Sequence, residues 1–143
     1  MVAMLVLGIM IVTLYAGFAS GLAVVQLARE NLRATQILVK RMEDVRLYTW
    51  SQITSATNYL KPAFTTYYSP SGASKGTIYS GVVTTNTPPG LPGDYQNYMV
   101  AITVTLYWTN YPTGAGSQSK AIVHSRTMQT YVARYGMQKY VYQ

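Results

Sequence analysis

The sequence predicts an α+β protein in which a long N-terminal helix packs on a C-terminal antiparallel β-sheet of three or four strands. Residues 1–28 contain no charged side chain, and a charged, helix-forming stretch follows directly from Arg29. Apolar residues then recur at every second position from Val100 to Trp108, which is typical of a strand with one buried face. We therefore divide the chain into an apolar helix segment (1–25), an amphipathic helix segment (26–56) and a sheet domain (57–143).

The uncharged N-terminal stretch is long enough to cross a membrane, since about 20 helical residues span a ~30 Å hydrocarbon core. It has no basic region before Val2 and is followed by no polar cleavage site of small residues. A secretory signal peptide would have both a basic region and such a cleavage site. We therefore expect the segment to be retained in the protein.

The second half of the predicted helix has one apolar face. Its apolar residues recur at spacings close to multiples of 3.6, while arginines, lysines and other polar residues occupy the other faces. This pattern predicts one helix of about fifty residues, apolar all round in its first half and one-sided in its second. The residues of the one-sided stripe are Leu27, Ala34, Leu38, Met42, Val45 and Ile53.

Three strands are expected in the C-terminal part. Residues 58–76 are rich in turn and breaker residues, which predicts an irregular connection. The inner face of the sheet needs a cover, and the one-sided half of the helix is the candidate for it. The expected strands are 77–85, 95–109 and 120–134, separated by loops at 86–93 and 110–117, with a short edge piece at 135–143. The predicted sheet core consists of Val100, Ile102, Val104, Leu106 and Trp108.

Composition limits the chemistry. The chain of 143 residues has no cysteine, which excludes disulfides, thiolate metal sites and a cysteine nucleophile. Eleven lysines and arginines against four acidic residues give a net charge of +7, which favours anionic partners such as lipid headgroups or nucleic acid.

Catalysis has little support in the sequence. Glu43 and Asp44 are adjacent on a predicted helix and so point to different faces, which does not suit a general acid/base pair. His124 is the only histidine, and no cysteine or nearby carboxylate completes a constellation around it. We expect an exposed strand histidine, and a protein that is not an enzyme and needs no cofactor or metal.

Tyrosine is used unusually often, with fourteen tyrosines against two phenylalanines. One interpretation is a set of stacking platforms for single-stranded nucleic acid. The other, which we favour because the basic residues do not cluster among the tyrosines, is a coat for a filament surface and its subunit interfaces. The tyrosines concerned are Tyr67, Tyr68, Tyr95, Tyr98, Tyr107, Tyr111, Tyr131, Tyr135, Tyr140 and Tyr142.

The run from Met1 to Val12 resembles the start of the conserved helix in the type IV pilin and type II secretion pseudopilin superfamily. The stretches 28–36 and 43–48 continue in the same style, so the resemblance covers roughly the first third of the chain. The opening of that family, with its processing site, methylated first residue and buried glutamate, is absent. The resemblance therefore implies that the reading frame extends upstream of Met1 through a glutamate-containing apolar stretch to a basic leader. The helix proline common in pilins would fall near Ala16 and is also missing.

The resemblance implies a subunit that polymerises through its apolar helix into an extracellular type IV pilus-like filament, after residing in the inner membrane. Its partners would be identical subunits and the pilus or secretion assembly machinery, with weak binding to nucleic acid or anionic surfaces. The residues expected to form the polymerisation helix are Met1, Met4, Leu5, Gly8, Ile9, Val12, Ala16, Gly17, Ala19, Ser20, Gly21 and Val24.

Two alternatives remain open at this point. The first is a minor or major pseudopilin of a type II secretion system, which would form a periplasmic filament. The second is a membrane-anchored binding module that does not polymerise. The length and abundance of filaments on cells would separate the first alternative from a pilus.

Overall fold

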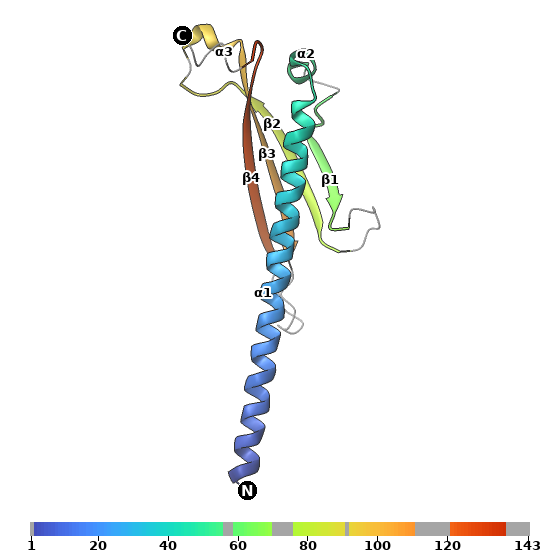
Figure 1. The fold of residues 1–143 in the computed structure, drawn as a ribbon, viewed down its shortest axis with the longest axis vertical. Coiled ribbons are helices and arrows are strands. Elements are labelled where there is room, and N and C mark those ends of the chain that lie inside the picture. The colour runs from blue at the N-terminus through green and yellow to red at the C-terminus, as the bar shows by residue number, and fades with distance from the viewer. Residues whose placement is uncertain (1, 56–58, 70–75, 91, 111–120, 137–143) are drawn as a thin grey trace.

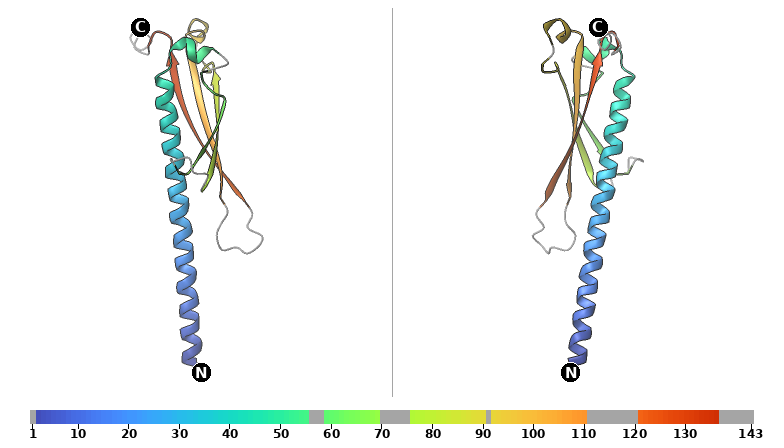
Figure 2. Two further views of the ribbon diagram at one scale, coloured as in Figure 1. Left: turned by 90° about the vertical axis from the view of Figure 1, so that its right-hand side faces the viewer. Right: turned by 60° about the vertical axis from the view of Figure 1, so that its left-hand side comes forward.

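The protein consists of one long helix with a four-stranded antiparallel sheet packed on its upper half, as a computed structural model shows (Figure 1). The structure describes residues 2–55, 59–69, 76–90, 92–110 and 121–136. Helix α1 spans Val2–Arg46 and projects well beyond the sheet at its N-terminal end. The two further views in Figure 2 show that the sheet lies along one side of the helix only. The predicted α+β architecture is confirmed.

The helix ends earlier than the sequence pattern predicts. Helix α1 stops at Arg46, where Leu47 and Tyr48 donate backbone hydrogen bonds to Asp44 and Val45 at 3.2 Å. A separate short helix, α2 (Trp50–Thr54), follows, and the backbone N–H of Thr49 donates to Oε1 of Gln52 at 2.9 Å across its first turn. The expectation of one continuous helix of about fifty residues is therefore wrong in its last turns. Ile53 is nevertheless buried, because the turn returns α2 toward the sheet.

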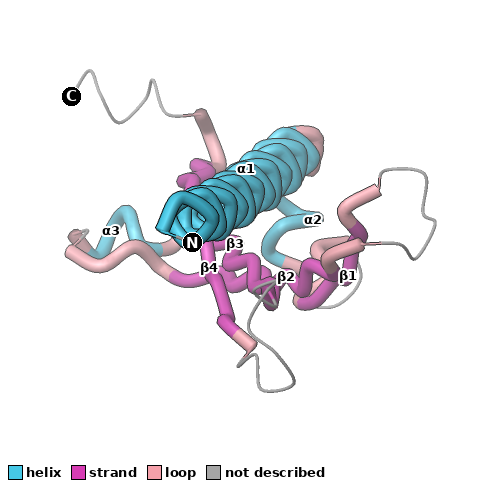
Figure 3. Tube along the Cα trace, turned by 90° about the horizontal axis from the view of Figure 1, so that it is seen from below, coloured by secondary structure: helices cyan, strands magenta, loops and turns pink. Residues whose placement is uncertain are grey.

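The sheet is a simple meander in the order β1-β2-β3-β4, with every neighbouring pair antiparallel. Its strands are β1 (Ala63–Tyr67), β2 (Ile78–Asn86), β3 (Met99–Asn110) and β4 (Ile122–Ala133). Strands β2, β3 and β4 fall within or close to the three predicted ranges. Seen from below in Figure 3, α1 lies on one face of this sheet.

Three local predictions need correction. Strand β1 lies inside the stretch predicted to be irregular; it is a short edge strand that begins directly after Pro62, whose carbonyl accepts a hydrogen bond from the N–H of Val83 at 2.8 Å. The predicted strand 95–109 starts only at Met99, because α3 (Gly93–Gln96) precedes it. Of the predicted edge piece, Tyr135 forms a turn with Arg134 and Gly136 follows outside any strand, while residues 137–143 lie outside the described part of the chain.

The core forms where the inner face of the sheet meets the upper half of α1. Val104, Leu106 and Trp108 pack with Tyr79 of β2 in one buried cluster that includes four residues of α1: Ala34, Ile37, Leu38 and Met42. Ile102 forms a second cluster with Val45 and Ile53, and Val100 packs against it from a half-buried position. Burial of each large side chain contributes about 1.5–3 kcal/mol, so this seam is the main stabilising contact between helix and sheet.

Two side-chain contacts flank the seam. On the β1 side, the Arg41 guanidinium lies 4.2 Å above the centre of the Phe64 ring. On the β4 side, Arg126 donates hydrogen bonds to the Asn31 carbonyl and the Thr35 hydroxyl of α1. Both edges of the sheet are thereby tied to the helix.

Position 81 accepts only glycine in this arrangement. Phe64 of β1 stands opposite Gly81 of β2 in the register, and a Cβ atom built at position 81 would overlap the Phe64 ring. The ring therefore occupies the space that the missing side chain leaves on the inner face.

We predict that Val104→Asp unfolds the sheet domain, whereas Thr103→Asp changes its stability little. Val104 is fully buried and an aspartate there has no partner, which costs at least about 3 kcal/mol. Thr103 points to the opposite, half-exposed face, where the expected loss is within about 1 kcal/mol. Thermal unfolding of the full chain in detergent micelles measures both, and equal effects would contradict the assigned faces.

We also predict that Gly81→Ala destabilises the protein by about 1–3 kcal/mol, because the Phe64 ring must leave its place between Gly81 and Arg41. Gly93→Ala, where an added Cβ meets no atom within 4 Å, is the matched control and should be close to neutral. In a Phe64→Ala background the cost of Gly81→Ala should largely disappear. A cost that persists there would point to backbone strain rather than to the ring.

Candidate assembly helix and the helix–sheet junction

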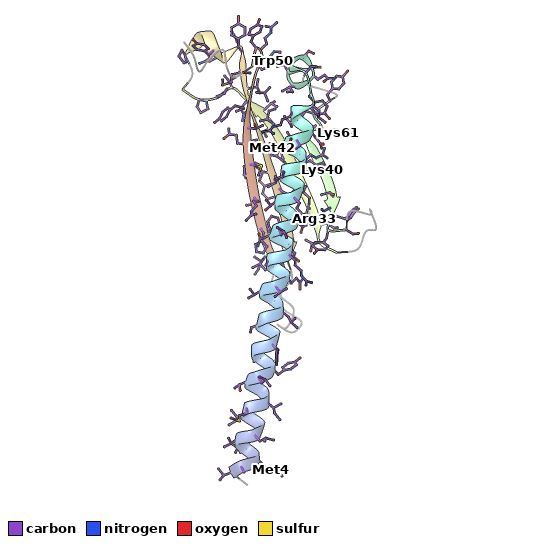
Figure 4. All side chains as sticks on the ribbon, in the orientation of Figure 1. Met4, Arg33, Lys40, Met42, Trp50 and Lys61 are labelled. Carbon is purple, nitrogen blue, oxygen red and sulfur yellow. The ribbon has the colours of Figure 1, made fainter. Side chains whose placement is uncertain are left out.

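The lower half of α1 is exposed on every side. From Val2 to Val25 its large apolar side chains are between 47% and 84% exposed, and Figure 4 shows side chains such as Met4 projecting freely from it. Exposing apolar surface to water costs roughly 25 cal/mol per Å². A segment of this length and composition therefore requires a cover that the chain itself does not provide among its described residues.

Two hydroxyl groups of this segment are satisfied within the helix. Thr13 donates to the Met10 carbonyl at 2.9 Å, and Ser20 donates to the Ala16 carbonyl at 3.0 Å. Back-bonding of this kind lets serine and threonine side chains sit in an apolar environment without an outside partner. Helix α1 is long and apolar enough to span a membrane.

Small residues leave the surface of this segment open. A Cβ added at Gly8, Gly17 or Gly21 would meet no atom within 4 Å. Around Gly8 the helix surface forms a shallow concavity of about 320 Å³, lined by Met4, Leu5, Gly8, Ile9, Val12 and Thr13. Five of the residues predicted to form the polymerisation helix thus meet in one notch.

The other residues predicted to form the polymerisation helix do not line the notch at Gly8. Ala16, Gly17, Ala19, Ser20, Gly21 and Val24 lie further along the same exposed half, outside the notch. Met1 lies outside the described residues.

A buried glutamate marks the point where α1 meets the sheet. Glu30 is only 3% exposed. Its Oε1 atom accepts hydrogen bonds from Thr77 at 3.0 Å and from Gln26 at 3.3 Å, while its Oε2 atom has no hydrogen-bond partner. The Tyr79 hydroxyl donates to the Glu30 backbone carbonyl at 3.1 Å. Two segments nearly fifty residues apart in the sequence are thus joined by hydrogen bonds at this level.

The environment of Tyr79 changes its acidity. Burial, followed by the negative charge of Glu30, raises the pKa of the Tyr79 hydroxyl well above its ordinary value of 10.0, and nearby Arg33 opposes this shift. The phenol therefore stays protonated and keeps its donor role above pH 10, where an ordinary tyrosine ionises. Its ring packs against Trp108 at 5.7 Å between ring centres.

Sequence reasoning missed both Glu30 and Tyr79. Glu30 lies four residues before Ala34 and eight before Leu38, so it occupies the buried stripe of the helix. This spacing could have revealed its place. Ile37 was missed in the same stripe.

Two grooves adjoin Glu30. The larger, of about 610 Å³, includes Gln26, Trp108 and Asn110 in its lining. The smaller, of about 450 Å³, extends down the helix to Leu22. Glu30 and Thr77 line both grooves.

The residues considered for catalysis, His124, Glu43 and Asp44, contact neighbouring side chains. His124 is half-buried rather than exposed, because its ring stacks on Trp108 at 5.5 Å between ring centres. Glu43 pairs with Arg46 at 3.0 Å, and Asp44 pairs with Arg41 at 3.7 Å. The described residues contain no group of three or more His, Cys, Asp or Glu side chains that could hold a metal ion.

The described tyrosines occur in more than one part of the fold. Tyr107 and Tyr131 lie on the outer face of the sheet and are 44% and 45% exposed. Tyr98 and Tyr135 form a tilted pair at 5.7 Å, with the Arg134 guanidinium 5.4 Å from the Tyr135 ring. Tyr111, Tyr140 and Tyr142 lie outside the described residues.

No protein-family model, curated protein or solved structure matches this chain.

We predict that the stability of the protein falls more steeply above pH 10 than that of a Tyr79→Phe variant. Tyr79 stays protonated in the folded state while it ionises in the unfolded chain above about pH 10, so alkali favours unfolding by up to about 1.4 kcal/mol per pH unit. Below pH 10 the two proteins should differ by about 1 kcal/mol, the value of the lost hydrogen bond. Thermal unfolding between pH 8 and 11 tests this, and parallel pH profiles would contradict it.

Proposed function

We propose that this chain is a structural, pilin-like subunit that polymerises through the lower half of α1 into an extracellular filament. The observation that supports the proposal is the apolar segment Val2–Val25, exposed on every side and continuous with the helix half that carries the sheet. The resemblance of the first third of the chain to type IV pilins and pseudopilins points the same way. The role is mechanical and requires no catalytic residue.

The physical basis of assembly is the exchange of one apolar environment for another. Before assembly the segment lies in the inner membrane and is covered by lipid. In a filament the same surface is covered by the helices of neighbouring copies, so transfer exposes little apolar area to water. The notch at Gly8 and the open positions at Gly17 and Gly21 allow neighbouring helices to approach closely.

The exposed half extends from the domain as one unbroken helix. Helix α1 runs for 45 residues from the apolar end to Arg46. In a filament this connection would place the sheet domains on the outside and the apolar halves at the centre. A secretion-type pseudopilin would use the same packing in a shorter periplasmic filament.

We predict that Gly8→Arg or Ala19→Arg abolishes filaments while leaving the sheet domain folded. A charge among packed apolar helices has no partner and costs several kcal/mol. Electron microscopy of filaments sheared from cells measures the yield, and immunoblots of membranes establish that the variants still insert.

Leu47→Arg is the control, because Leu47 is 82% exposed and lies beyond the end of α1; it should assemble normally. A normal yield from Gly8→Arg would overturn the assignment of this segment as the filament core. An unaltered chain that accumulates in membranes and never forms filaments would instead favour the anchored binding module.

A further inference from the structure

The smaller groove at the junction crosses the boundary between the apolar and the polar halves of α1. It has a volume of about 450 Å³ and is lined from the helix by Leu22, Val25, Arg29 and Glu30, and from the sheet domain by Tyr68 and Thr77 among others. Its lower end is therefore apolar and its upper end carries two opposite charges. This order of side chains follows the helix axis.

The length of helix that lines the groove is similar to the depth of the surface layer of a bilayer. Arg29 and Glu30 are the first charged residues after the apolar segment 2–25, and they belong outside the hydrocarbon because unpaired charges inside it are costly. Seven residues separate Leu22 from Arg29, which is about 10 Å along a helix. The headgroup layer on each side of a membrane is of similar depth, about 5–8 Å. With Leu22 at the hydrocarbon boundary, Arg29 and Glu30 lie among the headgroups.

The two charges in the groove have no ionic partner in the described part of the chain. Arg29 is exposed and forms no salt bridge there. Glu30 is 3% exposed, and its Oε2 atom is buried without a hydrogen-bond partner. A buried carboxylate oxygen without a partner is uncommon and costs free energy. Because Oε2 has almost no accessible surface in this conformation, an ammonium group in the groove removes this cost only when the Glu30 carboxylate turns toward it.

Tyr68 adds a side chain suited to the same layer. It is 37% exposed, and its backbone N–H donates a hydrogen bond to the Thr77 carbonyl at 3.0 Å. Tyrosine prefers membrane interfaces, where its ring contacts apolar matter and its hydroxyl meets water or headgroups.

We propose that this groove binds the headgroup of a phosphatidylethanolamine, with the phosphate at Arg29, the primary ammonium at Glu30, and an acyl chain along Leu22 and Val25. The inference rests on the membrane-resident stage of the proposed function. A primary ammonium donates charge-assisted hydrogen bonds to a carboxylate, whereas the quaternary ammonium of phosphatidylcholine has no N–H to donate. The Glu30 carboxylate disfavours phosphatidylglycerol, although the net charge of +7 by itself would favour that anionic lipid.

The test is native mass spectrometry of the full chain released from detergent micelles, with the three lipids carrying identical acyl chains. We expect the unaltered protein to retain phosphatidylethanolamine about tenfold more strongly than phosphatidylcholine or phosphatidylglycerol, which corresponds to one charge-assisted hydrogen bond. Equal retention of the three lipids, or a preference for phosphatidylglycerol, would overturn the proposal without the need for any variant.

Single substitutions test the separate roles of Arg29 and Glu30 in lipid binding. Glu30→Gln should abolish the preference for phosphatidylethanolamine, and Arg29→Gln should lower the retention of all three lipids while the protein stays folded, since Arg29 is exposed. Glu43→Gln, which removes an exposed acid at the far end of α1, is the matched control and should change nothing. Thermal unfolding checks that each variant is folded, and an unaltered lipid ranking in folded Glu30→Gln would refute the role of Glu30.

The lipid measurement is independent of filament formation. It uses single chains in micelles, so a failure of lipid selectivity leaves the filament yields of the Gly8 and Ala19 variants unchanged. Conversely, a chain that never polymerises can still show the predicted lipid ranking.

Discussion

The packing of the upper half of α1 against the inner face of the sheet is the contact on which the rest of the structure depends. The meander of four strands has one apolar face that must be buried, and among the described residues α1 covers that face together with Ile53 of α2. Ala34 is fully buried at this seam, in the same cluster as Val104 and Leu106. Helix and sheet therefore fold as one unit.

This seam also determines how the lower half of the helix is presented. Because the upper half is fixed by the core and by the contacts of Arg41 and Arg126, the lower half extends from the domain in a defined direction. The hydrogen bonds from Thr77 and Tyr79 to Glu30 fix the last point of contact. The change from a covered to an uncovered helix thus coincides with the first charged residues after the apolar segment 2–25.

The elements with long, regular apolar patterns were predictable from the sequence. The short strand β1 and the end of α1, which have no such pattern of their own, were missed. Strand β3 was predictable because five inward residues alternate with a polar face, and four of the five are buried. Strand β1 was not, since it has one large inward apolar residue, Phe64, and its pairing relies on the space at Gly81. The end of α1 was obscured because Ile53 continues the apolar spacing across the turn, although it reaches the core from a different helix.

The sequence by itself determined the apolar half of α1 and its one-sided continuation, because both depend only on which residue types recur along a helix. The tertiary structure alone decided the burial of Glu30 and the raised pKa of Tyr79, because each depends on a strand that returns to the helix from more than forty residues away. The charged groove followed from the same junction. Local pattern fixes what a segment needs to bury, but only the folded chain shows which polar groups are enclosed with it.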